Sequence, residues 1–275
     1  MNASNTGPTA YHDESLGRRL RYSDLRVHNG TFRTSHDGQV IEKLDIRNGN
    51  IRISHSNVTI RAVRIISSAG EGGAYAIKWS TRDARGALIE YLEVDGKTNR
   101  NTAMALQIAS NGPVTVRNCH IYGHAGGIRF GPGNTVEQCY VHSQNTWKGS
   151  HNTAISMHGG DGATVRRNNL VGSTSSALSL YANSSGIRNV LVENNLLNGG
   201  SYCTYAGGAE RKPYSHLNEN IRYRGNKFGR LLYPKCGEYG PVSAWSSQRG
   251  GTQWCNNTWQ DTGEKVAISE VGCRN

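Results

Sequence analysis

Val165-Arg-Arg-Asn-Asn-Leu170 is one copy of a six-residue frame that recurs along the chain, next as Val192-Glu-Asn-Asn-Leu-Leu197. Eight copies open and close on an apolar residue and start 20 to 31 residues apart. The six others are Ile60-Arg-Ala-Val-Arg-Ile65, Ile89-Glu-Tyr-Leu-Glu-Val94, Val116-Arg-Asn-Cys-His-Ile121, Val136-Glu-Gln-Cys-Tyr-Val141, Tyr223-Arg-Gly-Asn-Lys-Phe228 and Trp254-Cys-Asn-Asn-Thr-Trp259. A repeat of this period is typical of a solenoid in which each copy forms one turn and the loops vary in length.

The fourth position of the frame changes character along the chain. From the first copy to the last it holds Val63, Leu92, Cys119, Cys139, Asn168, Asn195, Asn226 and Asn257. Equivalent residues on successive turns of a parallel stack lie about 4.8 Å apart, and side-chain amides at that spacing hydrogen-bond to one another. The preference of asparagine for turns explains single copies but not four in one column. We therefore predict an asparagine ladder at an internal turn.

A second strand precedes several frames and alternates between apolar and other residues. The residues expected to point inward are Ile77, Leu106, Ile128, Ile155 and Leu178, with Trp79, Ile108, Phe130, Met157 and Leu180. Because strand side chains alternate between faces, the residues between them must point outward. That predicts an exposed column of Lys78, Gln107, Arg129, Ser156 and Ser179, flanked by Ser80, Ala109, Gly131, His158 and Tyr181.

The rest of the pattern favours an all-β chain of one structural domain. No stretch has sustained 3.6-residue periodicity, apart from a short turn expected near residues 15–20, and 34 glycines separate short β runs. We predict a right-handed parallel β-helix of about eight or nine coils. Because a solenoid has open ends, residues 1–40 and 263–275 are expected to form terminal cap segments around a β-helix at 41–262.

The net charge of +11 indicates a polyanionic partner. Lys and Arg are scattered through all repeats rather than gathered with stacking aromatics, so we expect acidic polysaccharide and not nucleic acid. No apolar run approaches the roughly 18 residues of a membrane span, and no membrane partner is expected. The chain has no long coiled-coil or other trimerising tail, so a monomer is expected.

The six cysteines fall into two groups. Cys119 and Cys139 belong to the inward column and are expected to stack as buried thiols. Of the other four, which lie in or beside irregular C-terminal loops, we favour the disulfides Cys203–Cys236 and Cys255–Cys273. Tight pairs of the kind that bind zinc are absent.

Several segments along nearly the whole chain carry a likeness to known proteins. They are Ala3-Ser-Asn-Thr-Gly-Pro8, Asn57-Val-Thr-Ile60, Asn189-Val-Leu-Val-Glu-Asn-Asn-Leu-Leu-Asn-Gly-Gly200, Asn226-Lys-Phe-Gly-Arg230 and Trp259-Gln-Asp-Thr-Gly263. With the repeat, they resemble the pectate-lyase-like superfamily of right-handed β-helix proteins, and more narrowly the secreted β-helix proteins of actinobacteria and the tail proteins of their phages. The resemblance implies polysaccharide lyases, glycoside hydrolases, sugar epimerases or phage depolymerases. It also implies a secreted or extracellular location, with a phage virion as the alternative.

The sequence departs from that resemblance at one place. Where such proteins tend to read His-Asn-Asp-Gly-Ile-Gln, this chain has His151-Asn-Thr-Ala-Ile-Ser156, so that Thr153 replaces an acidic residue. If the acid is catalytic or binds metal in the relatives, that chemistry is in doubt here. Asp161 is the nearest substitute in the sequence.

The residue types on the outward face suit β-elimination on a uronate. That reaction needs a cation for the carboxylate, a base for the proton at C5 and an acid for the leaving oxygen. Arg129 offers a bidentate fork, and Lys78 adds charge. A histidine, His158 or His151, is expected to be the base, and a tyrosine, Tyr181 or Tyr205, the acid.

A groove along the exposed face is expected to hold the polymer between two long loops, 143–151 and 202–220. The residues predicted to bind substrate are Lys78, Gln107, Trp147, Lys148, Tyr205, Glu210 and Arg211. Trp147 can stack on a sugar ring because its indole offers flat apolar area at small entropic cost. A loop tryptophan that only covers the adjacent strand is the alternative.

Two other functions remain open from the sequence. A glycoside hydrolase needs two carboxyl groups about 5 to 10 Å apart, whereas only Asp161, Glu210 and Asp95 are candidates near the groove. A non-catalytic carbohydrate-binding or phage-tail β-helix would use the same groove for adhesion. No cofactor is expected; Ca²⁺ would need clustered acids, which the sequence does not present, and no residue is predicted to bind metal.

Overall fold

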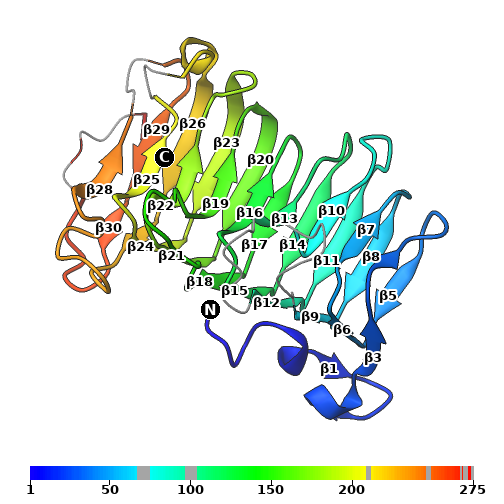
Figure 1. Cartoon of the computed structure of the whole chain (residues 1–275). Helices are drawn as coiled ribbons and strands as arrows, with labels where there is room; N and C mark the ends of the chain where they lie inside the picture. Colours follow the sequence, from blue (N-terminus) through cyan, green and yellow to red (C-terminus); the bar gives the residue numbers. More distant parts are fainter. Residues whose placement is uncertain are drawn as a thin grey trace.

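The computed structural model describes residues 1–66, 75–96, 104–208, 212–245, 249–266, 268 and 272–273. Within them the chain winds as a right-handed parallel β-helix, which confirms the predicted fold (Figure 1). Three parallel sheets run along the stack, and we call them sheets 1, 2 and 3. They contain nine, nine and ten described strands.

Each coil contributes one strand to each sheet. Sheet 1 comprises β4 (Phe32–Arg33), β7 (Ile51–Ile53), β10 (Ile77–Trp79), β13 (Met104–Gln107), β16 (Gly126–Phe130), β19 (Thr153–Met157), β22 (Ser176–Leu180), β25 (Tyr202–Ala206) and β28 (Gly240–Ser243). Sheet 2 comprises β5 (Val40–Glu42), β8 (Val58–Arg61), β11 (Ala87–Glu90), β14 (Val114–Arg117), β17 (Thr135–Glu137), β20 (Gly160–Arg166), β23 (Ile187–Glu193), β26 (Glu219–Arg224) and β29 (Gln253–Cys255). Sheet 3 comprises β3 (Arg26–Asn29), β6 (Leu44–Arg47), β9 (Arg64–Ile66), β12 (Glu93–Asp95), β15 (His120–Tyr122), β18 (Tyr140–His142), β21 (Asn169–Gly172), β24 (Leu196–Gly199), β27 (Lys227–Phe228) and β30 (Thr258–Trp259).

The six-residue frame is the corner between sheets 2 and 3. Its third residue takes a left-handed conformation in every copy, with φ between 51° and 61°. One such residue turns the chain sharply, so the frame's first two residues end a strand of sheet 2 and its last lies in sheet 3. Asparagine and glycine tolerate this conformation best, but Ala62 and Tyr91 adopt it as well.

The predicted asparagine ladder is present at this corner. The side-chain Nδ2 of Asn168 donates to Oδ1 of Asn195 at 2.9 Å, Asn195 to Asn226 at 2.9 Å, and Asn226 to Asn257 at 2.8 Å. Each Oδ1 also accepts the backbone N–H of the preceding asparagine at 3.0 Å. Leaving one such buried donor unpaired costs about 1–3 kcal/mol, so the ladder fixes the stacking of four successive coils.

The cysteines also lie as predicted. Cys119 and Cys139 are buried free thiols, and burial raises the pKa of the Cys119 thiol. The disulfides Cys203–Cys236 and Cys255–Cys273 are both present, with Cα atoms 5.8 and 5.6 Å apart. They tie the irregular C-terminal loops to the coils of β25 and β29.

The apolar residues predicted to point inward from sheet 1 form the core. Ile77, Leu106, Ile128, Ile155 and Leu178 have no exposed surface. Burying a side chain of this size contributes about 1.5–3 kcal/mol, and the repeat supplies one such residue per coil. The interior is thus a continuous apolar column enclosed by three sheets.

Sheet 2 carries a charged row on its outer face that alternates in sign from coil to coil. In register along the sheet stand Glu42, Arg61, Glu90, Arg117, Glu137, Arg166, Glu193 and Arg224. We call this row the paired ladder. Glu90 is 3% exposed and contacts both Arg61 at 2.5 Å and Arg117 at 2.6 Å.

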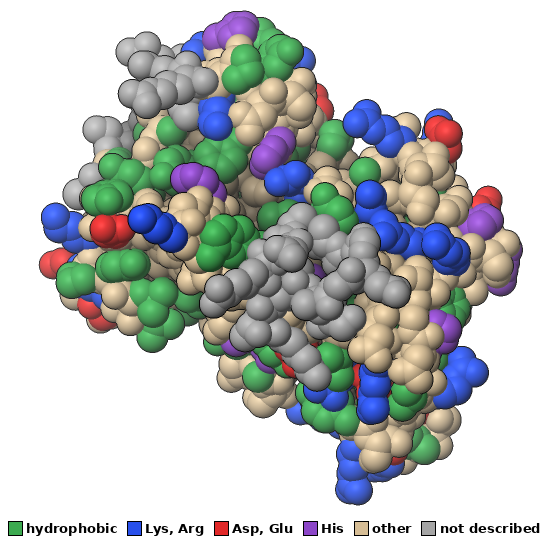
Figure 2. All heavy atoms as spheres, viewed as in Figure 1, with side chains coloured by type: hydrophobic (Ala, Val, Ile, Leu, Met, Phe, Trp, Pro, Cys, Tyr) green, Lys and Arg blue, Asp and Glu red, His purple; other side chains and the backbone are tan. Residues whose placement is uncertain are grey.

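Sheet 1 carries a different row on its outer face, without an acidic residue. In register stand Arg33, Arg52, Lys78, Gln107, Arg129, Ser156, Ser179, Tyr205 and Ser243. We call this row the open column. Figure 2 shows His side chains next to Lys or Arg side chains near the centre of one face of the molecule.

The first 25 residues lie along sheet 3. The Gly7 N–H donates to the Asn118 carbonyl at 2.8 Å, and Asn169 Nδ2 donates to the Met1 carbonyl at 2.9 Å. The Tyr22 hydroxyl donates to buried Glu93 at 2.6 Å. The stack itself begins with β3 at Arg26, inside the range 1–40 where we expected a cap. The segment includes the 3₁₀ turns η1 (Pro8–Ala10) and η2 (Tyr22–Asp24); η3 (Ser215–Leu217) lies near the other end.

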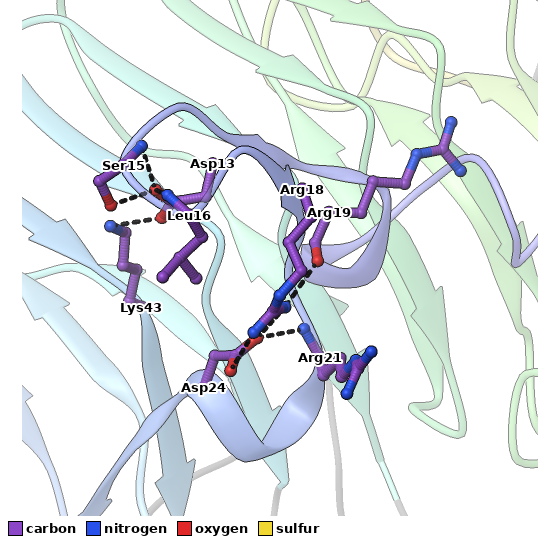
Figure 3. A network of polar contacts seen from close by, with 8 residues as sticks. All are labelled: Asp13, Ser15, Leu16, Arg18, Arg19, Arg21, Asp24 and Lys43. Atoms are coloured by element: carbon purple, nitrogen blue, oxygen red, sulfur yellow. Dashed lines mark hydrogen bonds and ion pairs between the residues drawn. The ribbon is translucent and has the colours of Figure 1, made fainter.

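The turn expected near residues 15–20 is not helical. It is an antiparallel hairpin of β1 (His12–Asp13) and β2 (Arg18–Arg19), as Figure 3 shows. Asp13 accepts the Ser15 N–H at 2.9 Å and forms an ion pair with Lys43. The Lys43 and Ser15 hydrogen bonds lower the pKa of Asp13 to about 2. A side chain that binds its own backbone in this way favours a tight turn over a helix.

After β30 the chain turns back over the other end of the stack. Thr258 and Lys265 form an antiparallel bridge, and Val266 is 2% exposed and belongs to the core. No helix within the described residues is long and apolar enough to cross a membrane.

Candidate functional site

Two pockets open on the outer side of sheet 1 and share Arg129 and His158. The larger encloses about 680 Å³ and the smaller about 510 Å³. The larger is lined by Met104, Arg129, His151, Thr153, Ser156, His158, Ser175, Tyr181, Asn183, Tyr205 and Lys212. The smaller is lined by Arg82, Gln107, Ile108, Ala109, Ser110, Asn111, Arg129, Phe130, Gly131, Pro132, His158, Gly159, Gly160, Ser184 and Ser185. Together they form one groove with Arg129 and His158 at the junction.

The repeat places the central side chains on adjacent coils. Arg129 points outward from β16 between buried Ile128 and Phe130. His158 directly follows β19, and Tyr181 directly follows β22. Because parallel neighbours lie about 4.8 Å apart, residues at or beside the ends of successive strands reach a common pocket.

Arg129 carries a half-buried positive charge. Burial lowers the pKa of its guanidinium from the usual value, which means that its surroundings do not fully replace water. Its Nε is buried and has no hydrogen-bond partner among the described residues. No Asp or Glu among the described residues lines either pocket. An anion entering the groove would therefore find an arginine donor available.

His158 is neutral at physiological pH. Burial, and then the positive charges of Arg129 and Lys212, lower its pKa from 6.5 to about 4. Its backbone carbonyl accepts the Ser184 N–H at 2.9 Å and the Ser184 hydroxyl at 2.8 Å. Asn183 Nδ2 lies 3.5 Å from His158 Nδ1. The residue is held by its main chain while its ring lines both pockets.

Tyr181 forms the next side of the larger pocket. Its ring lies edge-on to the His158 ring, with centroids 5.8 Å apart. Its hydroxyl is 3.1 Å from the Ser175 hydroxyl, and either can be the donor. Lys212 Nζ lies 4.7 Å from the centre of the Tyr181 ring, a cation–π contact. Burial raises the pKa of the neighbouring Tyr205 hydroxyl.

The larger pocket thus brings together all four residues predicted to be catalytic, Arg129, His151, His158 and Tyr181, and also Tyr205. Of the other predicted residues, Gln107 lines the smaller pocket. Lys78 stands in the open column two coils from Arg129, and it lines neither of the two pockets. Its Nζ lies 5.3 Å from the centre of the Tyr75 ring.

The two loops expected to wall the groove each contribute to the larger pocket, with His151 from the first and Lys212 from the second. Trp147 is 40% exposed, and neither it nor Lys148 lines either of the two pockets. His151 is the part of that loop that reaches the groove. Glu210 and Arg211 lie outside the described residues.

Part of the expected exposed column is covered. Ser156 is 3% exposed, and Ser179 has no exposed surface, its hydroxyl hydrogen-bonding to Ser176. A serine side chain is short, so in register with Arg129 and Tyr205 it lies at the floor of the face rather than on its surface. The alternation of residues along the strands correctly predicts which way these side chains point, but not how exposed they are to solvent.

Sequence reasoning missed Lys212 and Asn183. Lys212 comes from a loop of non-repeating length. The one signal in the sequence that could have identified it is its position next to Glu210 and Arg211. Thr153, which replaces the acid of the resembling proteins, is 6% exposed and lines the larger pocket. Asp161, the nearest substitute in the sequence, lines neither of the two pockets; it is exposed on β20 and accepts a hydrogen bond from Asn189 at 2.8 Å.

The described residues contain no group of three or more His, Cys, Asp or Glu side chains placed to hold a metal ion. The chain belongs to the family described as Right handed beta helix region, which matches residues 49–228, more than half of its length. Comparison with curated proteins and with solved structures gave no match. The family accounts for the repeat and the three sheets, whereas the reaction must be argued from the groove.

Proposed function

We propose that this protein is a lyase that cleaves an acidic, uronate-containing polysaccharide by β-elimination in the groove over sheet 1. The observation that carries the proposal is the junction of the two pockets. There a half-buried arginine, with no carboxylate among the described residues that line either pocket, stands beside a neutral histidine. A carboxylate ligand would supply the missing counter-charge.

The groove offers a residue for each step of the elimination. Arg129 binds the uronate carboxylate and stabilises the negative charge that develops when the C5 proton leaves. Neutral His158 accepts that proton. The electron pair of the C5–H bond forms the C4–C5 double bond, the bond from C4 to its oxygen breaks, and the Tyr181 hydroxyl protonates the leaving oxygen.

The charge of the groove disfavours a glycoside hydrolase. Hydrolysis uses two carboxyl groups on opposite sides of the scissile bond. The two pockets contain none among the described residues. A cationic groove with a neutral base suits proton removal next to a carboxylate better than protonation of a glycosidic oxygen by a carboxylic acid.

A non-catalytic module that binds the same polymer is the second candidate. Thr153 favours it, because a threonine lines the pocket where the resembling proteins tend to have an acid. Such a module would retain Arg129 for binding and would not need His158.

Incubation with alginate, pectate, glucuronan, hyaluronan and chondroitin tests the proposal. β-Elimination yields an unsaturated uronate, which absorbs in the ultraviolet, and the variant R129A/H158A is expected to abolish the signal while keeping its circular dichroism spectrum. Release of reducing ends without absorbance would indicate a hydrolase. Binding of a polymer without either unsaturated product or new reducing ends would indicate the non-catalytic module.

The two disulfides support an extracellular site of action, since such bonds persist in oxidising compartments. Acidic polysaccharides of cell walls and capsules are found there. We therefore propose that the protein acts outside the cytoplasm.

A further inference from the structure

Four tyrosines form a continuous row that begins in the larger pocket and leads away from it. The ring centroids of Tyr181 and Tyr205 are 5.4 Å apart, those of Tyr205 and Tyr202 5.7 Å, and those of Tyr202 and Tyr239 5.9 Å. Tyr181 and Tyr205 line the pocket, whereas Tyr202 and Tyr239 lie beyond it. We call these four residues the tyrosine row.

The row advances toward the C-terminal end of the stack. Tyr181 follows β22, Tyr202 and Tyr205 lie in β25, and Tyr239 directly precedes β28, three successive strands of sheet 1. By the strand register it also crosses sheet 1, from just beyond the end of β22 to just before the start of β28, so it runs obliquely to the helix axis and offers a polymer contacts on more than one coil.

The outer end of the row is fixed in place although it is exposed. Tyr239 is 62% exposed, and its N–H donates to the Ser201 carbonyl at 2.9 Å. The Glu238 N–H donates to the Gly200 carbonyl at 2.9 Å, and the Cys203–Cys236 disulfide anchors the same loop to β25. Contiguous exposed apolar surface marks a binding site more often than a single exposed ring does, and Tyr239 continues the row that begins in the larger pocket.

The chemistry of the row differs from that of the junction. Tyrosine rings offer flat apolar area to the C–H faces of sugars, and their hydroxyls can hydrogen-bond to sugar hydroxyls. The hydroxyls of Tyr202 and Tyr205 have no hydrogen-bond partner among the described residues. Lys212, against the Tyr181 ring, adds a positive charge where the row meets the pocket.

We infer that the tyrosine row binds further sugar units of the same acidic polysaccharide, on the side of the junction toward the C-terminal end. The inference rests on the proposed function for the identity of the polymer. Sugar units bound on this side hold the chain across the junction, so that cleavage falls within the polymer. Long oligosaccharides should therefore appear first among the products.

The test uses full-length protein with His158→Ala, which keeps the groove but cannot cleave. In that background, Tyr202→Ala with Tyr239→Ala should weaken binding of the polymer about tenfold by calorimetry. Binding of a trisaccharide from the same polymer should be unchanged, because it fills only the pocket. Tyr22→Ala, a tyrosine 44% exposed beside sheet 3, is the matched control and should change neither affinity.

Equal weakening for polymer and trisaccharide would overturn the inference, since it would indicate a damaged pocket. Unchanged polymer affinity would overturn it too, as would a failure of every polymer in the panel to bind. If the wild type binds polymer through the row but releases no unsaturated product, the lyase proposal fails and the row stands. If it cleaves and the tyrosine variants bind normally, only the row fails.

Discussion

The outer faces of sheets 1 and 2 are built from the same repeat, but charges of opposite sign stand in register along the described strands of sheet 2 and not along those of sheet 1. In the paired ladder every arginine stands in register beside a glutamate, and Glu90 contacts arginines on both sides. In the open column Arg33 stands beside Arg52, and Arg52 beside Lys78, with no acid in the row. Like charges directly opposite one another destabilise a sheet. The difference is in line with the proposal above, in which the first face serves stability and the second binds an anionic ligand.

The largest expected effect comes from removing both partners of Glu90. Arg61→Ala with Arg117→Ala leaves a carboxylate that is 3% exposed without its cations, which should lower the free energy of unfolding by about 3 kcal/mol. Urea denaturation measures this, and activity per folded molecule should not change. Adding Glu90→Gln should restore part of the stability, because a neutral amide needs no cation.

Arg129→Ala should have the opposite effect to the double arginine variant, lowering activity strongly and stability little. Activity on the polymer should fall about a hundredfold, the usual loss for a donor to developing negative charge. The free energy of unfolding should change by less than about 1 kcal/mol, because the variant removes a half-buried charge that forms no ion pair with the described residues. If instead Arg129→Ala unfolds the protein and the double arginine variant of the ladder loses activity, the comparison between the faces is wrong.

The pH dependence of activity reports on His158, on the sheet 1 face. The base must be neutral, and the pKa of His158 is about 4, so kcat/KM should stay high down to about pH 4. Lys212→Gln removes one cause of the lowered pKa, so the acid limb should move to higher pH. Lys227→Gln, an exposed lysine on sheet 3, should leave the limb in place.

The same shift affects stability with a definite sign. The pKa of His158 is about 4 in the folded protein, against the ordinary value of 6.5 in the unfolded chain. Between these two pH values the unfolded chain therefore binds a proton at His158 more readily than the folded protein does. The free energy of unfolding should therefore fall as pH drops through this window. His158→Gln should reduce that fall in urea denaturation curves recorded across it; an unchanged curve would contradict the lowered pKa.

The smallest expected effect is that of salt. Raising ionic strength from about 0.05 M to about 0.5 M should weaken polymer binding roughly fivefold, because the charged side chains of the open column are at least partly exposed and their attraction is screened. The urea midpoint should change little, since the buried Glu90 contacts are screened less. A midpoint that falls steeply with salt would show that the paired ladder is not buried in solution.

The repeat made much of the fold predictable. The asparagine ladder and the buried thiols follow from columns that the sequence displays, and the two favoured disulfide pairings are also present. The alternation of Arg61, Glu90, Arg117 and Glu137 was also visible, at the second position of the frame, although only the strand register identifies them as neighbours. Lys212 and Tyr239 could not be placed, because their loops do not repeat and loop length carries no register.

The sequence by itself determined the coil, its inward column and the outward direction of Arg129, because period-two strands and a fixed corner repeat with the chain. It placed His158 and Tyr181 beside that arginine for the same reason. Only the tertiary structure decided which outward residues are covered, which charges have partners and which loop residues line the groove. Those properties depend on side-chain burial and contacts between coils, which arise when segments far apart in the chain are stacked.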